Sequence, residues 1–322
     1  MKPLSWTFMN QSSLLEFATN NRKIRADKFL EEMDKAIPWG KFLGLICPQY
    51  YKKKDNRGRK RADLETLLRI YFLQQWFALS DLSAEELIHD RLSFRRFINI
   101  DICETSLDET TICKFRHFLE EHGLTEKMFA IVRKILEDKN LILQDGTCVD
   151  ATIIKASSST KNTGKKRDEE MSSTRKGANY TFGMKAHIGS DAKSKLIHTV
   201  RTTTAKTHDS AVMDDLLHGE EQAVFGDKAY ADKDKKKAWR RQGRYWGVQD
   251  RATKWSPLSS AQRKKNRRHS SVRAGVEHPF HTIKHLWNYQ KVRYKGLKKN
   301  TAQIFSLCFL ANLHRVRHQF AP

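Results

Sequence analysis

The chain has 322 residues, 39% of them hydrophobic, and 60 Lys and Arg against 37 Asp and Glu, a formal net charge of +23 at pH 7. This length and apolar content can bury a substantial core, so we expect a globular protein with one large domain and an attachment, or with two moderate domains. The sequence has no run of about 18 apolar residues and no signal-peptide core, which argues against a membrane partner and leaves nucleic acid as the leading candidate for a soluble, intracellular protein.

The first helix that the sequence marks clearly begins after residue 60. Residues 1–55 mix short apolar clusters with charge, and we expect a connecting or arm-like region there. From Leu64 to Trp76 apolar residues recur at helical spacing, and Asp63 stands where an N-cap belongs.

Capping signals predict three more helices before residue 140. Two have the form of a capping box, and a third cap follows a glycine suited to ending a helix. The boxes are Ser83 with Glu86 and Ser106 with Glu109, and the last pair is Gly123 with Thr125. Residues 1–140 are therefore predicted to form a mostly α-helical N-terminal domain.

The capped helices between Ser83 and Leu119 allow two interpretations. They could form a helix-turn-helix with Lys114, Arg116 and His117 facing a groove of DNA. An ordinary helical bundle gives the same pattern. We expect this domain to bind DNA, with Lys114 and Arg116 as candidate contacts.

After Leu141 the pattern changes to short β-rich segments. A buried strand over 147–153 contains Asp150, and a flexible basic excursion is expected near 155–178. Next, Gly189–Asp191 is predicted to join two alternating segments, 180–188 and 196–203, into a hairpin. The remaining predicted elements, in order, are a short helix over 209–217, a strand over 223–226 followed by Asp227, a charged helix from Asp232, a strand over 245–248 and a final helical region carrying Glu277.

This order of elements predicts a ribonuclease-H-like fold over residues 141–322. Such a fold is an α/β (α+β) arrangement in which a mixed five-stranded sheet is flanked by helices, with three antiparallel strands first and later strands reached by helical crossovers. The five cysteines are scattered and odd in number, so we expect reduced, mostly buried thiols and no disulfide framework.

Three acidic residues are candidates for a metal-dependent catalytic site. Phosphodiester cleavage can be assisted by two hard divalent cations, Mg²⁺ or Mn²⁺, which prefer carboxylate oxygens. Asp150 and Asp227 each stand at a predicted strand end, and Glu277 lies in a predicted helix. Taken singly, these acids could be a turn residue, an N-cap and a surface ion-pair residue. Together they match the need for converging carboxylates.

Cations surround the third acid in the sequence. Arg273, Glu277, His281 and Lys284 are spaced so that they share one face of a helix, as expected where a metal ligand and phosphate contacts adjoin. Pro279 would either kink that helix or mark its first turn.

A second basic segment extends from residue 233 to residue 268, with 14 Lys or Arg against Asp234 and Asp250. We expect it to neutralise DNA phosphates, with Lys264 and Arg267 as candidate contacts together with Lys228, the neighbour of Asp227. The tryptophans at 239, 246 and 255 could stack on bases, although core packing is expected for at least two of them. His187, His208 and His281 are too far apart for a zinc site and are expected to make structural hydrogen bonds.

These residues resemble the DDE transposases of bacterial insertion sequences, in the group named after insertion sequence five. The resemblance covers nearly the whole chain. It includes residues 58–61, 108–111 and 115–117 in the first half, and residues 149–152, 183–187, 226–230 and 276–280 in the second. The family signature Tyr-x₂-Arg-x₃-Glu-x₆-Lys appears at Arg273, Glu277 and Lys284, with Ser270 in place of the Tyr.

The resemblance implies a function and a set of partners. Asp150, Asp227 and Glu277 would hold two metal ions. The reaction would be hydrolysis at the 3′ ends of the element, followed by attack of the freed 3′-hydroxyl on target DNA. The partners would be double-stranded DNA, at the terminal inverted repeats and the target, and a second copy of the chain. The expected location is the bacterial cytoplasm, at the nucleoid. A nuclease without strand transfer, and an inactive basic DNA-binding protein, are the alternatives.

Overall fold

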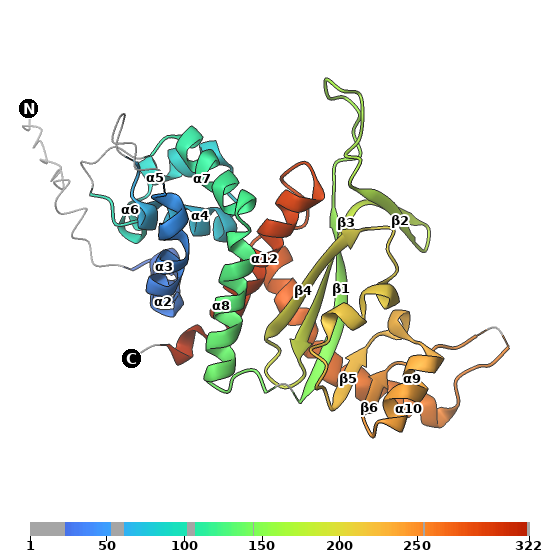
Figure 1. Ribbon diagram of the computed structural model, residues 1–322. Helices are drawn as coiled ribbons and strands as arrows, with labels where there is room; N and C mark the ends of the chain where they lie inside the picture. The colour runs from blue at the N-terminus through green and yellow to red at the C-terminus, as the bar shows by residue number, and fades with distance from the viewer. Residues whose placement is uncertain (1–22, 53–60, 102–106, 144, 254, 321–322) are drawn as a thin grey trace, which may run out of the picture.

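The computed structural model describes residues 23–52, 61–101, 107–143, 145–253 and 255–320. A helical region comes first, and a sheet with helices on both faces follows (Figure 1). The helices of the first region are α2 (Arg25–Ala36), α3 (Trp39–Tyr50), α4 (Leu64–Phe77), α5 (Asp81–Asp90), α6 (Leu92–Phe97), α7 (Glu109–Glu121) and α8 (Leu124–Asp138).

Helix α4 confirms the prediction from its cap and its apolar spacing, because the Asp63 side chain accepts a hydrogen bond from Thr66 N at 2.8 Å. The interpretation of residues 1–55 as an arm is wrong for residues 25–50, which form α2 and α3. These two helices bury only three and two side chains fully. Such short apolar stripes are hard to distinguish from a loop in the sequence.

The caps of the next helices lie two or three residues from their predicted positions. Ser80 caps α5 by accepting from Ser83 N at 3.0 Å, so Ser83 lies inside the helix. Asp108 caps α7, whereas Ser106 lies outside the described residues. Gly123 has φ of 59° and precedes the first residue of α8, so Thr125 is inside that helix. Where several Ser, Asp and Gly residues lie close together, tertiary packing selects the cap.

The sheet contains β1 (Gly146–Lys155), β2 (Ser172–Lys176), β3 (Asn179–Asp191), β4 (Ile197–Thr204), β5 (Ala223–Gly226) and β6 (Tyr245–Val248). β3 pairs antiparallel with β1 on one side and with both β2 and β4 on the other. β5 joins β1 in parallel, and β6 joins β5 in parallel. Three antiparallel strands followed by two parallel ones form the ribonuclease-H-like arrangement, which confirms the predicted fold.

Two details of the sheet correct the prediction. The sheet has six strands rather than five, because residues 172–176 of the expected flexible excursion pair with β3 as β2. The hairpin link also lies later than expected. Residues 189–191 belong to β3, and the Asp191 carboxylate accepts from Lys193 N and Ser194 N to shape the turn before β4.

Helices and helical turns complete the second region. They are η1 (Asp209–Val212), η2 (Asp214–Leu216), η3 (Lys228–Tyr230), α9 (Lys233–Arg241), α10 (Ser260–Arg273), η4 (Ala274–Val276), α11 (Glu277–His281), the π-helical turn η5 (Thr282–Leu286), α12 (Leu297–Val316) and η6 (Arg317–Gln319). The predicted helix over 209–217 is two short 3₁₀ turns. Asp232 caps α9 as expected.

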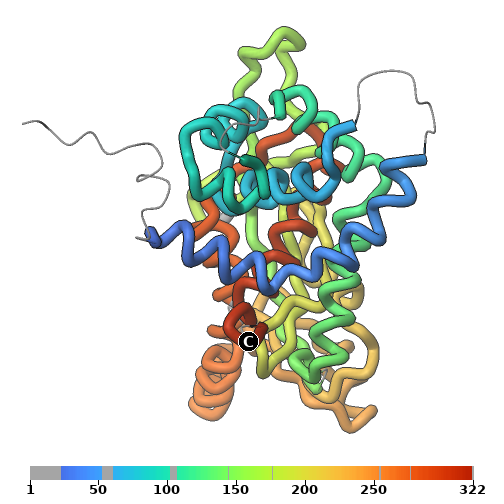
Figure 2. The backbone as a smooth tube through the Cα atoms, turned by 90° about the vertical axis from the view of Figure 1, so that its left-hand side faces the viewer, coloured from blue at the N-terminus to red at the C-terminus, as the bar shows by residue number. Residues whose placement is uncertain are grey.

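The two faces of the sheet pack against different partners. Cys148 and Ile154 of β1 join a large core that extends through α12 and α8 into the N-terminal helices. Val149 points to the other face, where Trp239 and Trp246 help form a smaller cluster. Figure 2 views the molecule from the side of the N-terminal helices. The helical region and one face of the sheet therefore share a continuous core.

Within the described ranges, no helix is both long and apolar enough to cross a lipid bilayer. Four cysteines lie in these ranges and are free thiols. Cys148 and Cys308 are buried, Cys113 is partly buried and Cys47 is exposed. The fifth, Cys103, lies outside the described residues.

Candidate active site

The strand register brings Asp150 and Asp227 to the same level of the sheet. β1 and β5 run parallel, and Cys148 stands opposite Phe225. Asp150 follows two residues after Cys148, and Asp227 follows two residues after Phe225. Asp227 also begins the next turn, because its Oδ1 accepts a hydrogen bond from Ala229 N at 2.6 Å. The predicted capping role and a place in the acidic site are therefore compatible.

Glu277 reaches the same region from the helical side. Helix α10 packs against β5 and β6, the 3₁₀ turn η4 lies against β1, and Glu277 follows as the first residue of α11. The expectation that residues 273–284 share one face of a regular helix is wrong, since the segment passes from α to 3₁₀ to α to π geometry. Pro279 lies in the first turn of α11, where a proline costs no helical hydrogen bond.

The electrostatic surroundings of Asp150 include the other two acids. Burial raises the pKa of Asp150 to about 6. The positive charge of Arg273 opposes this rise, and the negative charges of Asp227 and Glu277 add to it. Arg273 ends α10, and its Nε is buried without a hydrogen-bond partner in the described structure. The site is thus a group of acids with one guanidinium beside them.

The chemistry of these side chains fits a divalent cation. Carboxylate oxygens are hard ligands that suit Mg²⁺ and Mn²⁺. A bound cation would favour the charged form of Asp150, whose pKa is raised first by burial and further by Asp227 and Glu277. Among the residues that the structure describes, no three His, Cys, Asp or Glu side chains are arranged as a complete metal-ligand group. The acids therefore fit a metal by their chemistry and charge, without forming a closed set of ligands.

A buried tyrosine adjoins the acids and had no predicted role. Tyr230 is 1% exposed, and its hydroxyl lacks a hydrogen-bond partner in the described structure. Burial strongly raises the pKa of Tyr230, and Asp209, Asp150 and Asp227 raise it further. The charges of these three carboxylates act on the Tyr230 hydroxyl, which places Tyr230 beside the acidic site. The motif 226–230 contained this residue, but the spacing gave no reason to single it out.

Asp209 is a fourth carboxylate near the site, and the sequence did not mark it. Lys185 Nζ donates to Asp209 Oδ1 at 2.9 Å, and His187 Nδ1 lies 4.0 Å from the same oxygen. Burial lowers the pKa of His187 to about 4, and its Nε2 bonds with Thr203 Oγ1 at 2.8 Å. This confirms the structural interpretation of His187. Alternation along β3 could have placed Lys185 and His187 on one face, but Asp209 comes from a distant turn.

The predicted DNA contacts have different environments. Lys284 Nζ donates to Thr152 Oγ1 at 2.8 Å and to Ile153 O at 2.9 Å, which fastens η5 to β1 beside the acids. The exposed candidates are Lys114, Lys228, Lys264, Arg267 and His281. Their exposure leaves them accessible to DNA phosphates.

The prediction that Arg116 faces a groove is wrong. Its side chain is buried and makes ion pairs with Asp81 at 2.9 Å and with Glu120 at 3.2 Å. The guanidinium also lies 4.1 Å from the ring centroid of Tyr294. Helical spacing had placed Arg116 near Lys114 but could not show which of the two faces the core.

The tryptophans divide as the packing argument predicted. Trp239 and Trp246 are buried and pack edge to face with ring centroids 5.9 Å apart. Trp255 is 87% exposed. Only Trp255 among them is therefore accessible to a base.

A ribonuclease-H-like sheet that gathers carboxylates at its centre defines a class of proteins that process nucleic acid at phosphodiester bonds. Comparison with protein families identifies the member of this class. Residues 143–313 match the Transposase DDE domain, and residues 19–118 match the Transposase domain (DUF772). The first match spans more than half of the chain, and the chain belongs to the Transposase DDE domain family. No solved structure matched the chain.

Membership of this family makes the protein a transposase of the polynucleotidyl-transferase type. Transposases act on DNA, and the DDE family generally uses divalent metal ions. The basic composition of the chain agrees with a DNA substrate.

Proposed function

We propose that this transposase belongs to the group named after insertion sequence five, and that it binds the terminal inverted repeats of an insertion sequence, cleaves the DNA there and joins the 3′ ends to a target. The observation that carries the proposal is the register of β1 and β5, which places Asp150 and Asp227 at the same level of a ribonuclease-H-like sheet, with the charges of Asp227 and Glu277 acting on Asp150. Hydrolysis alone would need the same acids, so strand transfer rests on the family resemblance.

We assign Asp150, Asp227 and Glu277 as catalytic residues and ligands of two divalent metal ions, Mg²⁺ or Mn²⁺. Two such ions, when bound, activate a water and stabilise charge on the attacking and leaving oxygens. When no metal is bound, the positive charge of Arg273 partly offsets the repulsion among the acids, because it opposes the rise in the pKa of Asp150.

Exposed cations around the acids are assigned to the DNA backbone. Lys228 follows Asp227, His281 ends the short helix that Glu277 begins, and Lys264 and Arg267 lie on α10. Lys284 acts indirectly, since its hydrogen bonds fix the position of η5 on β1. Cationic side chains at exposed positions bind phosphates and release counterions from the duplex.

The helical region, residues 1–140, is assigned to recognition of the inverted repeats, with exposed Lys114 on α7 as a candidate contact. Both ends of an element must be brought together for transposition, so we propose a homodimer on DNA. The expected setting is the bacterial nucleoid.

The substitution Asp227→Asn tests the assigned site. Asparagine is as good a helix cap as aspartate, so η3 keeps its start while a metal ligand loses its charge. We expect Mg²⁺-dependent cleavage of end DNA to fall by about 1000-fold or more, with DNA binding nearly unchanged. Asp232→Asn is the matched control, because Asp232 caps α9 in the same way and should keep full cleavage.

Equal cleavage by the wild type and Asp227→Asn would refute the assigned site. Pre-cleaved ends and a supercoiled target distinguish the alternatives. Joined products are expected from a transposase, whereas cleavage without joining would indicate a nuclease. DNA binding without cleavage by the wild type would indicate an inactive DNA-binding protein.

A further inference from the structure

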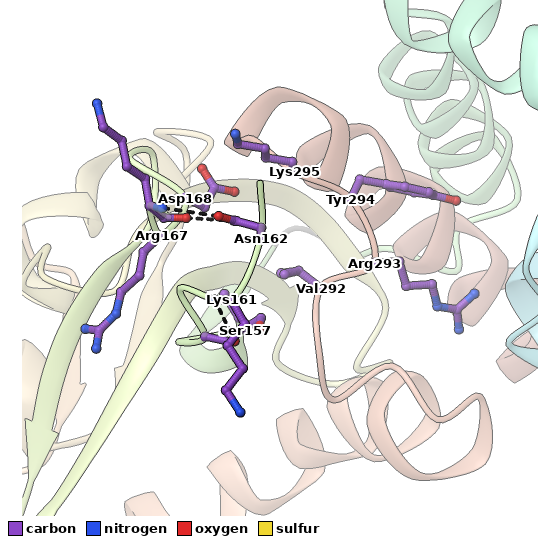
Figure 3. A pocket seen from close by; sticks show the side chains of 12 residues that line it. Ser157, Lys161, Asn162, Arg167, Asp168, Val292, Arg293, Tyr294 and Lys295 are labelled. Carbon is purple, nitrogen blue, oxygen red and sulfur yellow. Dashed lines mark hydrogen bonds between the residues drawn. The ribbon is translucent and has the colours of Figure 1, made fainter. Parts of the chain in front are cut away.

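A pocket of about 470 Å³ lies at the far end of β1 from the acids (Figure 3). One wall comes from residues 156–168, which leave the end of β1, and the other from residues 292–295, which precede α12. We propose that this pocket binds phosphodiester groups of the DNA end while its scissile phosphate is at the acids. The proposal rests on the proposed function and adds a second point of contact with the same DNA.

The lining of the pocket is strongly cationic. Lys161, Lys166 and Arg167 come from the first wall and Lys295 from the second, and all four residues are exposed. In Figure 3, Lys161 and Arg167 belong to the first wall and their side chains extend away from Lys295, which belongs to the second. Arg293 also lines the pocket, but its Nη1 donates to Gln74 O at 3.3 Å. A concave surface with four exposed cations suits a polyanion.

Two acidic residues at the pocket, Asp168 and Glu170, connect its two walls and do not neutralise most of the cations. Asp168 Oδ2 accepts from Gly296 N at 2.7 Å, which ties the first wall to the second. Glu170 accepts from Leu297 N next to it. In the described ranges, no carboxylate forms an ion pair with Lys161 or Lys295. Lys166 lies 3.7 Å from Glu169, and both side chains are highly exposed, so that pair is weak.

The pocket is also fixed to the strand that carries Asp150. Lys155 and Lys291 form a parallel bridge, in which Lys155 N donates to Gln290 O at 3.0 Å and Val292 N donates to Lys155 O at 2.8 Å. The first wall thus continues from the end of β1, and the second wall is hydrogen-bonded to that end. A binding site joined to β1 in this way keeps a constant distance from Asp150.

That distance suits a continuous DNA strand. Lys155 is five residues beyond Asp150 on β1, which corresponds to about 17 Å at roughly 3.3 Å per residue. A duplex covers this length in about five base pairs, at about 3.4 Å each. Lys155 and Lys291, both exposed, lie between the acids and the pocket. The pocket begins beyond Lys155, so the phosphates expected in it are about six to eight nucleotides from the cleavage site, at about 3.4 Å per base pair.

The end of the element is the DNA that this geometry favours. The backbone of the cleaved end is covalently continuous with the phosphate at the acids, so a site at constant distance meets the same phosphates in every reaction. Target DNA is the competing occupant, and the experiment below separates the two.

The test compares Lys161→Ala/Lys295→Ala with Lys127→Ala/Lys134→Ala, which removes the same charge from exposed positions of α8. Affinity for an end duplex is measured at several salt concentrations, without cleavage, in Ca²⁺. We expect the pocket variant to lower the slope of log affinity against log salt by about two, since each lysine that contacts a phosphate contributes about one. The α8 variant should keep the wild-type slope.

Duplexes with single neutral methylphosphonates locate the contact. In the wild type, substitutions about six to eight nucleotides from the cleavage site should weaken binding several-fold, and in the pocket variant the same substitutions should have no further effect. Equal slopes for both variants, or an unchanged methylphosphonate pattern in the pocket variant, would overturn the proposal. Normal end binding with loss of joining to a target would also overturn it, in favour of target DNA.

This readout is independent of the chemistry at the acids. A wild-type protein that shows the methylphosphonate pattern but cuts no DNA would support the pocket while refuting the proposed reaction. A protein that cuts and joins DNA but shows no such pattern would refute the pocket alone.

Discussion

Arg116 holds the helical region together through its charge. It bridges α5 and α7 through Asp81 and Glu120, and it lies under the ring of Tyr294, which precedes α12. Both oppositely charged partners have limited exposure, 22% and 8% of their side chains. Removing a buried cation that pairs with two carboxylates strongly destabilises the folded state, because the carboxylates then lack an opposite charge.

We expect Arg116→Ala to lower the free energy of unfolding by about 3–5 kcal/mol, since it removes the cation that pairs with both Asp81 and Glu120. Lys114→Ala, two residues earlier and exposed, should change it by less than about 0.5 kcal/mol. Urea unfolding followed by circular dichroism measures both. Similar stability of the two variants would contradict the structural role of Arg116.

Local sequence patterns identified part of the candidate site. Asp227 directly follows β5, as predicted, whereas the prediction of a strand end at Asp150 is wrong, because β1 continues to Lys155. The pairing of β1 with β5 still brings the two acids level. Tyr230 and Asp209 could not be identified, because their meeting depends on η1 packing against η3. Arg116 was misassigned for a related reason, since spacing along one helix does not reveal which neighbouring helix supplies an acid.

Among the elements, α12 connects the two regions of the chain. It packs against α8, α2 and α7 on one side and against β4 on the other. Phe309 contacts the rings of Phe42 and Phe72, and Phe305 contacts Phe129. At the sheet, Asn312 accepts from Ile197 N at 2.8 Å and donates to Ile197 O at 2.7 Å. The apolar surface of α12 thus depends on helices from the first 140 residues.

We therefore expect residues 141–322 not to fold alone. Without the N-terminal helices, Phe305 and Phe309 would face water, and the fragment should aggregate or bind a hydrophobic dye. Co-expression of residues 1–140 as a separate chain should restore a soluble complex. Size-exclusion chromatography and calorimetry check this, and a cooperative unfolding transition of the isolated fragment would contradict it. End recognition is consequently better tested with point variants such as Lys114→Ala than with a deletion.

The elements that the sequence predicted well have strong local signals. Helix α4 has both a cap and a long apolar face, and β6 has the predicted bounds of Tyr245–Val248. β2 was missed because its residues are polar and its stability comes from pairing with β3. α2 and α3 were missed because their buried faces are completed by other helices, including α12 and α4. Local patterns are least informative where tertiary contacts determine the structure.

At the scale of the whole molecule, three histidines are kept neutral in different places. Burial lowers the pKa of His187 in β3, His198 in β4 and His314 in α12 to about 4 in each case. An unfolded histidine has a pKa near 6.5, so between pH 6.5 and pH 4 the unfolded chain binds more protons than the folded one. These histidines therefore do not lower the free energy of unfolding above pH 6.5, and they lower it progressively as the pH falls from 6.5 toward 4.

Each of the three histidines can change the free energy of unfolding by up to about 1.4 kcal/mol per pH unit in this window. Asp150 acts in the opposite direction, because its pKa is raised to about 6, so these four groups together correspond to about two protons. We expect the free energy of unfolding to fall by up to about 3 kcal/mol per pH unit near pH 5. His314→Gln should reduce that slope, since it removes one imidazole whose pKa is lowered, whereas His285→Gln, at an exposed position of η5, should not. Urea unfolding at pH 7.5, 6.0 and 5.0 measures the slope, and identical slopes for the two variants would show that His314 takes up its proton without unfolding.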